Sequence, residues 1–207
     1  MYLVDIGNTK AHLYNGSEVV NLDYSELFNL YGDKKLYYIN VNRDLSNKLK
    51  AIANWINIEP FVKIEGEYSG MGVDRRALLL SKDDGIYIDA GSAITIDKKL
   101  NGKFIGGTIL PGIYSLINSY SDISKVLNLN SLSDVNLDIL PNSSTKETLN
   151  YGIIAPIVAF VKSINKESLP IYCCGGDGEI LAKYLNAKFD KELIFTGMKK
   201  VIKEIKC

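Results

Sequence analysis

The 207-residue chain has few of the residues on which several kinds of protein chemistry depend. It contains one histidine and three cysteines. The only histidine, His12, is interpreted as a structural residue on a strand, and catalytic triads centred on histidine are in practice excluded. Cys173 and Cys174 are adjacent and lack further partners for a zinc site or a disulfide framework. A buried structural role is therefore expected for both.

Neither charge nor hydropathy indicates a nucleic-acid or membrane partner. The 24 basic and 24 acidic side chains cancel, so no excess of positive charge is available to attract a polyanion. No apolar run approaches the roughly 18–20 residues of a membrane helix. No basic amino-terminal region precedes a long apolar segment, as it would in a signal peptide. We therefore expect a cytoplasmic protein that binds neither nucleic acid nor a membrane.

A P-loop is also missing, because the pattern Gly-x4-Gly-Lys-[Ser/Thr] does not occur. The chain instead contains one pattern twice: a strand, Asp-x-Gly-[Asn/Ser], a second strand, Asn-Gly and a third strand. The first copy is headed by Asp5 and the second by Asp89. Asn15-Gly16 and Asn101-Gly102 are strong signals for tight hairpins. The duplication predicts two similar α/β lobes with mixed sheets.

The boundary between the lobes is expected between residues 84 and 85, which gives domains 1–84 and 85–207. Helical periodicity predicts a helix over 44–56, and an apolar run predicts a strand over 59–64. Asp74 stands where a helix through Leu80 begins. Ser144, three residues before Glu147, predicts a capped helix over 143–164, and the last helix is expected over 197–206.

The two Asp-x-Gly turns predict a phosphate-bearing ligand held between the two lobes. Backbone N–H groups in a tight turn can converge on anionic oxygens, and the side chains of Asn8, Thr9 and Ser92 add donors. Asp5 and Asp89 would hold the cations that neutralise phosphate. A single copy is most simply an ordinary turn, but two copies in matching hairpins favour the phosphate interpretation.

A third glycine cluster, Gly175-Gly176-Asp177-Gly178, lies between a strand and a helix. Its spacing differs from that of a dinucleotide-binding fingerprint. Two interpretations remain open. Either the glycines lack side chains so that a nucleoside can lie close to the backbone, or they form a plain strand-to-helix turn.

Five motifs together resemble the type III pantothenate kinases. They are VDIGNT at 4–9, GVDRR at 72–76, IDAGSAITID at 88–97, GGTILPG at 106–112 and Ser-Thr-x-Glu at 144–147. This family belongs to the actin-like, sugar-kinase-like superfamily of duplicated ribonuclease-H-like lobes with a nucleotide cleft between them. The resemblance spans residues 1 to about 185 in the right order.

The resemblance implies ATP-dependent phosphorylation of pantothenate, the entry step to coenzyme A, in a homodimer that completes each pantothenate site. It implies ATP or phosphate binding by Asp5, Ile6, Gly7, Asn8, Thr9, Lys10, Ala11, His12, Ser92, Gly175 and Gly176. It implies pantothenate binding by Tyr68, Gly72, Val73, Asp74, Arg75 and Thr145. Asp5 would lie near Mg²⁺, directly or through water, and Asp89 would hold potassium or ammonium. Ser92 replaces the family's usual threonine and keeps the hydroxyl.

Asp74 would be the general base that accepts the proton of the pantothenate hydroxyl, which suits the needs of phosphoryl transfer. The alternative is that Asp74 merely caps its helix. Arg75 is the candidate partner of the pantothenate carboxylate, and one of Arg75 and Arg76 is expected at the surface. The rival functions are a kinase for another small hydroxy acid or sugar, and a nucleotide-binding regulator without turnover.

Overall fold

The structure, a computed structural model, describes residues 1–205. The chain forms two compact units. The first unit comprises Met1–Asp84, Lys99–Gly106 and the chain from Asp190 onward, and the second comprises Gly85–Lys98 and Gly107–Phe189. The tip of one hairpin and the last helix therefore cluster with the first unit, whereas the sequence division assigned both to residues 85–207.

The first unit is built on a five-stranded sheet of order β3-β2-β1-β4-β5. Its strands are β1 (Tyr2–Ile6), β2 (Ala11–Tyr14), β3 (Val19–Leu22), β4 (Leu36–Asn40) and β5 (Trp55–Asn57). Its helices are α1 (Tyr24–Tyr31), α2 (Ser46–Lys50), α3 (Val73–Leu80) and α7 (Leu193–Ile205), with 3₁₀ turns η1 (Arg43–Leu45) and η2 (Glu59–Phe61). Strand β1 is antiparallel to β2 and parallel to β4.

The second unit repeats this topology, with the order β10-β9-β6-β7-β8. Its strands are β6 (Gly85–Ala90), β7 (Ala93–Leu100), β8 (Lys103–Pro111), β9 (Ile171–Cys174) and β10 (Lys188–Phe189). Its helices are α4 (Ile113–Ile123), α5 (Thr145–Ile164) and α6 (Gly178–Leu185), with the 3₁₀ turn η3 (Lys125–Leu127). Read from the outer strand of each hairpin, both sheets have the same connectivity, which confirms the predicted duplicated α/β fold.

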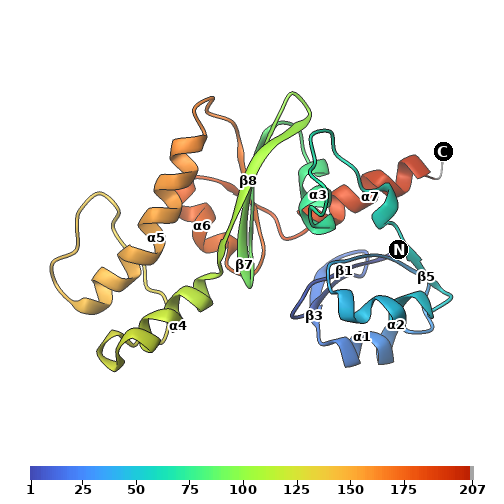
Figure 1. The fold of residues 1–207 in the computed structure, drawn as a ribbon, viewed down its shortest axis with the longest axis horizontal. Helices are drawn as coiled ribbons and strands as arrows, with labels where there is room; N and C mark the ends of the chain where they lie inside the picture. The colour runs from blue at the N-terminus through green and yellow to red at the C-terminus, as the bar shows by residue number, and fades with distance from the viewer. Residues whose placement is uncertain (206–207) are drawn as a thin grey trace. The chain divides into compact units, whose positions relative to one another are not determined.

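Each unit has its own apolar core. In the first, Val4 and Ile6 of β1 pack with Leu27 of α1 and Leu49 of α2. Helices α1 and α2 thus lie together on one side of this sheet (Figure 1). In the second, apolar residues of β6 and β7 pack against α4, α5 and α6 (Figure 1). Nearly every side chain of the central strands β1 and β6 is buried, so these strands are buried on both faces of their sheets.

The adjacent cysteines lie at the end of β9, and both are buried, as expected. Burial raises the pKa of the Cys173 thiol to about 12, so this thiol stays protonated at neutral pH. Within residues 1–205, no helix has the length and apolar character needed to cross a membrane.

The prediction for residues 44–64 was correct only for the start of the helix, which η1 and α2 form. The helix ends at Lys50, and Trp55–Asn57 form the edge strand β5, which pairs in parallel with β4. The expected strand over 59–64 is replaced by the η2 turn, which contains Pro60. Proline lacks the N–H that a strand interior needs, and Trp55 is buried by its contacts with the sheet and α1 rather than by a helical period.

Helix α7 packs on α3 and on the sheet of the first unit (Figure 1). The ring of Phe195 stacks on Tyr14 of β2 with centroids 5.8 Å apart. A Cβ added at Gly197 would lie 1.8 Å from the backbone oxygen of Ala77 in α3. The two helix backbones therefore meet at a position that only glycine permits.

We expect Gly197→Ala to lower the free energy of unfolding by about 1–3 kcal/mol, because the two helix backbones must move apart. The substitution removes a glycine from a helix, which by itself favours folding, so a loss identifies the contact as the cause. Urea unfolding measures the change. Gly176→Ala is the matched control, since a Cβ there meets no atom within 4 Å. Equal stability of the two variants would contradict the contact.

Candidate functional site

A polar cavity of about 460 Å³ lies in the first unit, beside the start of α3. It is bordered by the end of β4, the first residues of α2, the η2 turn and the loop that leads into α3. Residues that line it include Tyr68, Gly72, Val73, Glu59, Glu67, Arg43 and Arg76. Three residues proposed from the sequence as substrate-binding, Tyr68, Gly72 and Val73, thus share one wall.

Asp74 is the second residue of α3, and the N-cap is Gly72. The alternative interpretation of Asp74 as the N-cap is therefore wrong. Its Oδ1 accepts a hydrogen bond of 2.8 Å from the backbone N–H of Arg75. A Cβ added at Gly72 would lie 2.4 Å from the same Oδ1. Glycine at position 72 therefore leaves the space that the Asp74 carboxylate occupies.

Burial raises the pKa of the Asp74 carboxyl above its ordinary value. The hydrogen bond from the Arg75 amide and the charges of Arg75 and Arg76 act in the opposite direction but are outweighed. Desolvation disfavours the charged form of a carboxyl group and so makes it more basic. A carboxylate with a raised pKa is better suited to accept a proton near neutral pH than an exposed one.

Arg75 and Tyr68 form a pair next to Asp74. The Nη1 of Arg75 donates a hydrogen bond of 2.6 Å to the Tyr68 hydroxyl oxygen. Arg75 is only 5% exposed, and the side chain of Arg76 is 13% exposed. The expectation that one of the two arginines is a surface charge was wrong, since both guanidinium groups take part in contacts inside the unit.

The first Asp-x-Gly turn is fixed by backbone hydrogen bonds. The Gly7 N–H donates to the Lys10 carbonyl oxygen at 3.0 Å, and the Tyr24 hydroxyl donates to the Gly7 carbonyl oxygen at 2.7 Å. Asp5 is buried near the end of β1, whereas Asn8 and Thr9 at the tip are exposed. The turn therefore presents its amide and hydroxyl donors to solvent, where an anionic ligand can reach them.

His12 has a structural contact of the kind expected from its position. Its Nδ1 lies 2.6 Å from Oδ1 of Asn21, its cross-strand neighbour on β3. Lys10, in the same segment, is exposed and lies 4.0 Å from a carboxylate oxygen of Asp23.

In the second unit, the Asp89 turn and the glycine cluster after β9 are in contact. A Cβ added at Gly175 would lie 2.5 Å from Asp89 Oδ1 and 2.5 Å from the Ala90 carbonyl oxygen, and Gly175 has a φ of +85°. The Asp177 N–H donates to Ala90 O at 2.9 Å. Glycine at position 175 therefore allows its backbone to lie close to the Asp89 turn. A Cβ at Gly176 would meet no atom within 4 Å.

The remaining predicted residues of the second unit, Ser92 and Thr145, are exposed. Thr145 is the first residue of α5, and Ser144 is its N-cap, whose hydroxyl oxygen accepts a hydrogen bond of 3.2 Å from the Glu147 amide. The predicted cap is confirmed. The helix start thus holds Thr145 at a fixed position on the surface of this unit.

Sequence reasoning missed the charged residues of the cavity wall. Glu59, Glu67 and Arg43 come from separate segments, so no spacing pattern connects them in the sequence. The only available signal was the position of Glu67 directly before Tyr68.

The chain is similar to known proteins over most of its length. The family model described as type III pantothenate kinase matches residues 40–167. A type III pantothenate kinase of Campylobacter jejuni is 40% identical over 205 residues, covering 99% of this chain and 97% of that protein. One of Helicobacter hepaticus is 36% identical over 206 residues, covering 99% of each.

Solved structures agree on the fold. A Campylobacter jejuni crystal structure, described as a candidate Baf family transcriptional activator, has a TM-score of 0.89 and 39% identity and covers 99% of this chain and 98% of that one. A candidate 2-dehydro-3-deoxygalactonokinase from Sinorhizobium meliloti has a TM-score of 0.56 at 7% identity and covers 99% of this chain and 96% of that one. The second likeness shows the fold alone.

The raised pKa of Asp74 predicts how this residue affects stability. Because its folded pKa lies above its unfolded value, its contribution to stability is fully present below the unfolded pKa and is lost as the pH rises through the folded pKa. We therefore expect Asp74→Asn to raise the Tm by a few degrees at pH 7. The advantage should disappear below about pH 4, where the aspartate is protonated in both states. Thermal unfolding across this pH range measures it, and an unchanged or lower Tm at pH 7 would refute it.

Proposed function

Since this chain belongs to the type III pantothenate kinase family, we propose that it transfers the terminal phosphoryl group of ATP to pantothenate in the cytoplasm, with Asp74 as the general base. The product is 4′-phosphopantothenate, and the reaction is the first step of coenzyme A biosynthesis. The observation that carries the assignment of the base is the desolvation of the Asp74 carboxyl, which raises its pKa. Asp74 directly follows Val73 of the cavity wall, although it does not itself line the cavity.

In this proposal, the acceptor hydroxyl lies next to Asp74, which takes its proton as the phosphoryl group arrives. Arg75, with the Tyr68 hydroxyl as its partner, pairs with the pantothenate carboxylate, and Gly72 and Val73 line the acceptor site. Phosphoryl transfer asks a protein mainly for positioning and for neutralisation of charge. These residues supply the positioning of the acceptor.

ATP is bound in this proposal by the segment Asp5–His12 and by Ser92, Gly175 and Gly176. Asp5 and Asp89 are hard oxygen ligands, which fits Mg²⁺ and a monovalent cation, respectively. Among residues 1–205, no three or more His, Cys, Asp or Glu side chains gather to hold a metal ion. A Mg²⁺ ion held near Asp5 would supply charge neutralisation there.

The first test is a coupled ADP-release assay with pantothenate and ATP, with and without potassium. We expect potassium-dependent turnover in the wild type and a fall in kcat of about 10²–10⁴-fold for Asp74→Asn, the usual contribution of a general base. Asp84→Asn is the matched control, because Asp84 accepts backbone hydrogen bonds from Asn101 and Gly102, away from the cavity wall.

Three other outcomes of this assay would change the assignment. Turnover that survives Asp74→Asn would remove Asp74 as the base. Turnover with another small hydroxy acid or sugar, but not with pantothenate, would change the substrate. Nucleotide binding without any turnover would favour the regulator. The Campylobacter jejuni structure is described as a candidate transcriptional activator, which is a regulatory role.

We also propose a homodimer in which Thr145 of one copy completes the pantothenate site of the other. The second unit carries an apolar groove of about 290 Å³, whose lining includes Leu110, Pro111 and Phe160. Of these, Phe160 is 38% exposed. Exposed apolar side chains that flank a groove are typical of an interface between subunits.

We expect Phe160→Glu to convert the dimer into a monomer, because a charge would be buried in the interface. Light scattering coupled to gel filtration measures the mass, and the KM for pantothenate should rise in the same variant. Ile139→Glu is the control, since Ile139 is also exposed but does not line the groove. A wild-type chain that is monomeric at micromolar concentration would contradict this assembly.

A further inference from the structure

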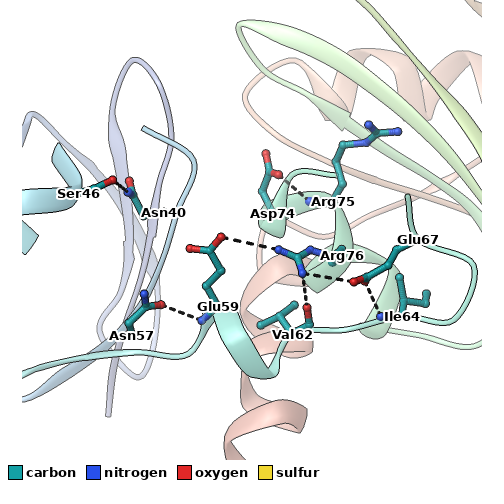
Figure 2. Close-up of polar contacts among 10 residues, drawn as sticks. All are labelled: Asn40, Ser46, Asn57, Glu59, Val62, Ile64, Glu67, Asp74, Arg75 and Arg76. Atoms are coloured by element: carbon teal, nitrogen blue, oxygen red, sulfur yellow. Dashed lines mark hydrogen bonds and ion pairs between the residues drawn. The ribbon is translucent and has the colours of Figure 1, made fainter. Parts of the chain in front are cut away.

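Arg76 lies at the centre of a charged network in the cavity wall. In Figure 2 its guanidinium group lies between Glu59 and Glu67, whereas the side chain of Arg75 points away from them. Its Nη2 lies 3.8 Å from Glu59 Oε1, and its Nη1 lies 3.6 Å from Glu67 Oε1. Nη1 also donates a hydrogen bond of 2.9 Å to the Val62 carbonyl oxygen.

These contacts join three segments to the first turn of α3. Glu59 belongs to the η2 turn, and the Asn57 side chain accepts a hydrogen bond of 2.8 Å from its amide. Glu67 accepts a hydrogen bond of 2.9 Å from the Ile64 amide through its second carboxylate oxygen (Figure 2). Arg76 therefore holds the loop from Val62 to Gly72, which carries Tyr68, against the helix that carries Asp74.

The network also sets the charge of the cavity. The side chains that line it include two cations, Arg43 and Arg76, and two anions, Glu59 and Glu67. These charges cancel. Without Arg76, the wall would present two carboxylates against one exposed arginine, and like charges at close range repel an anionic ligand.

We propose that Arg76 is a positioning residue that lets a carboxylate-bearing acceptor enter the cavity beside Asp74. It neutralises Glu59 and Glu67 and fixes the loop that carries Tyr68. This inference rests on the proposed function, because pantothenate is an anion. It assigns to Arg76 a role separate from that of Arg75, which is the proposed partner of the acceptor carboxylate.

The test compares pantothenate with an uncharged analogue in which an amide or alcohol replaces the carboxylate. For Arg76→Gln we expect the KM for pantothenate to rise about 10-fold, with kcat changed less than about 3-fold and the KM for the uncharged analogue changed less than about 2-fold. Arg76→Lys keeps the charge and should lose only part of the effect. The triple variant Arg76→Gln/Glu59→Gln/Glu67→Gln should regain most of the lost affinity for pantothenate.

A purely structural role predicts the opposite for the triple variant. Removing two more polar partners would weaken the loop further, and the KM would not recover. An equal rise in KM for both acceptors, or no change for either, would also overturn the role of charge.

A second measurement does not depend on turnover. Hydrogen exchange of the Ile64 amide, which donates to Glu67, should be faster in Arg76→Gln than in the wild type. The Gly7 amide, bonded to Lys10 O elsewhere in the unit, is the internal control. Unchanged exchange at Ile64 would refute the clamp on the loop. Absence of wild-type turnover with pantothenate would instead refute the proposed function and leave this measurement valid.

Discussion

The contact between Gly197 of α7 and the backbone of Ala77 in α3 determines where the candidate acceptor site lies in the first unit. Helix α3 is only eight residues long, and it carries Asp74, Arg75 and Arg76 in its first turn. A helix this short has little stability of its own and depends on packing. The close approach of α7, secured by the stacking of Phe195 on Tyr14, supplies that packing. The last helix of the chain thus supports residues more than a hundred positions earlier.

The packing of α7 on α3 matters because the buried Asp74 carboxylate lowers the stability of the folded protein. Burial raises its pKa, which means that the charged form is less stable in the folded protein than in water. The same desolvation makes the carboxylate a better proton acceptor. Desolvation of the Asp74 carboxylate therefore lowers stability while it favours proton transfer. The position of Asp74 must then be fixed by other contacts, such as the α3–α7 contact and the Arg76 network.

Much of the fold could be predicted from the sequence, because its signals are local. Asn15-Gly16 and Asn101-Gly102 form the expected turns, and the two Asp-x-Gly segments begin at the ends of the central strands β1 and β6. The helix predicted over 44–56 ends early, at Lys50. Its second half was wrong because β5 is three residues long and is defined by its pairing with β4, which leaves no local pattern. The docking of α7 could not be predicted either, since an amphipathic helix shows that it has a partner but does not show which one.

Only those residues of the candidate site that lie close together in a sequence motif could be predicted. Gly72, Val73 and Asp74 are contiguous, and Tyr68 is near them in the chain. The charges of the wall are not contiguous: Glu59 and Glu67 meet Arg76 only after the chain has folded. The neutrality of the whole chain argues against a polyanionic partner, but it says nothing about one cavity. What decides whether a small anion can approach Asp74 is the local balance of two carboxylates and two guanidinium groups, and that balance depends on a side chain whose neighbours are set by tertiary structure.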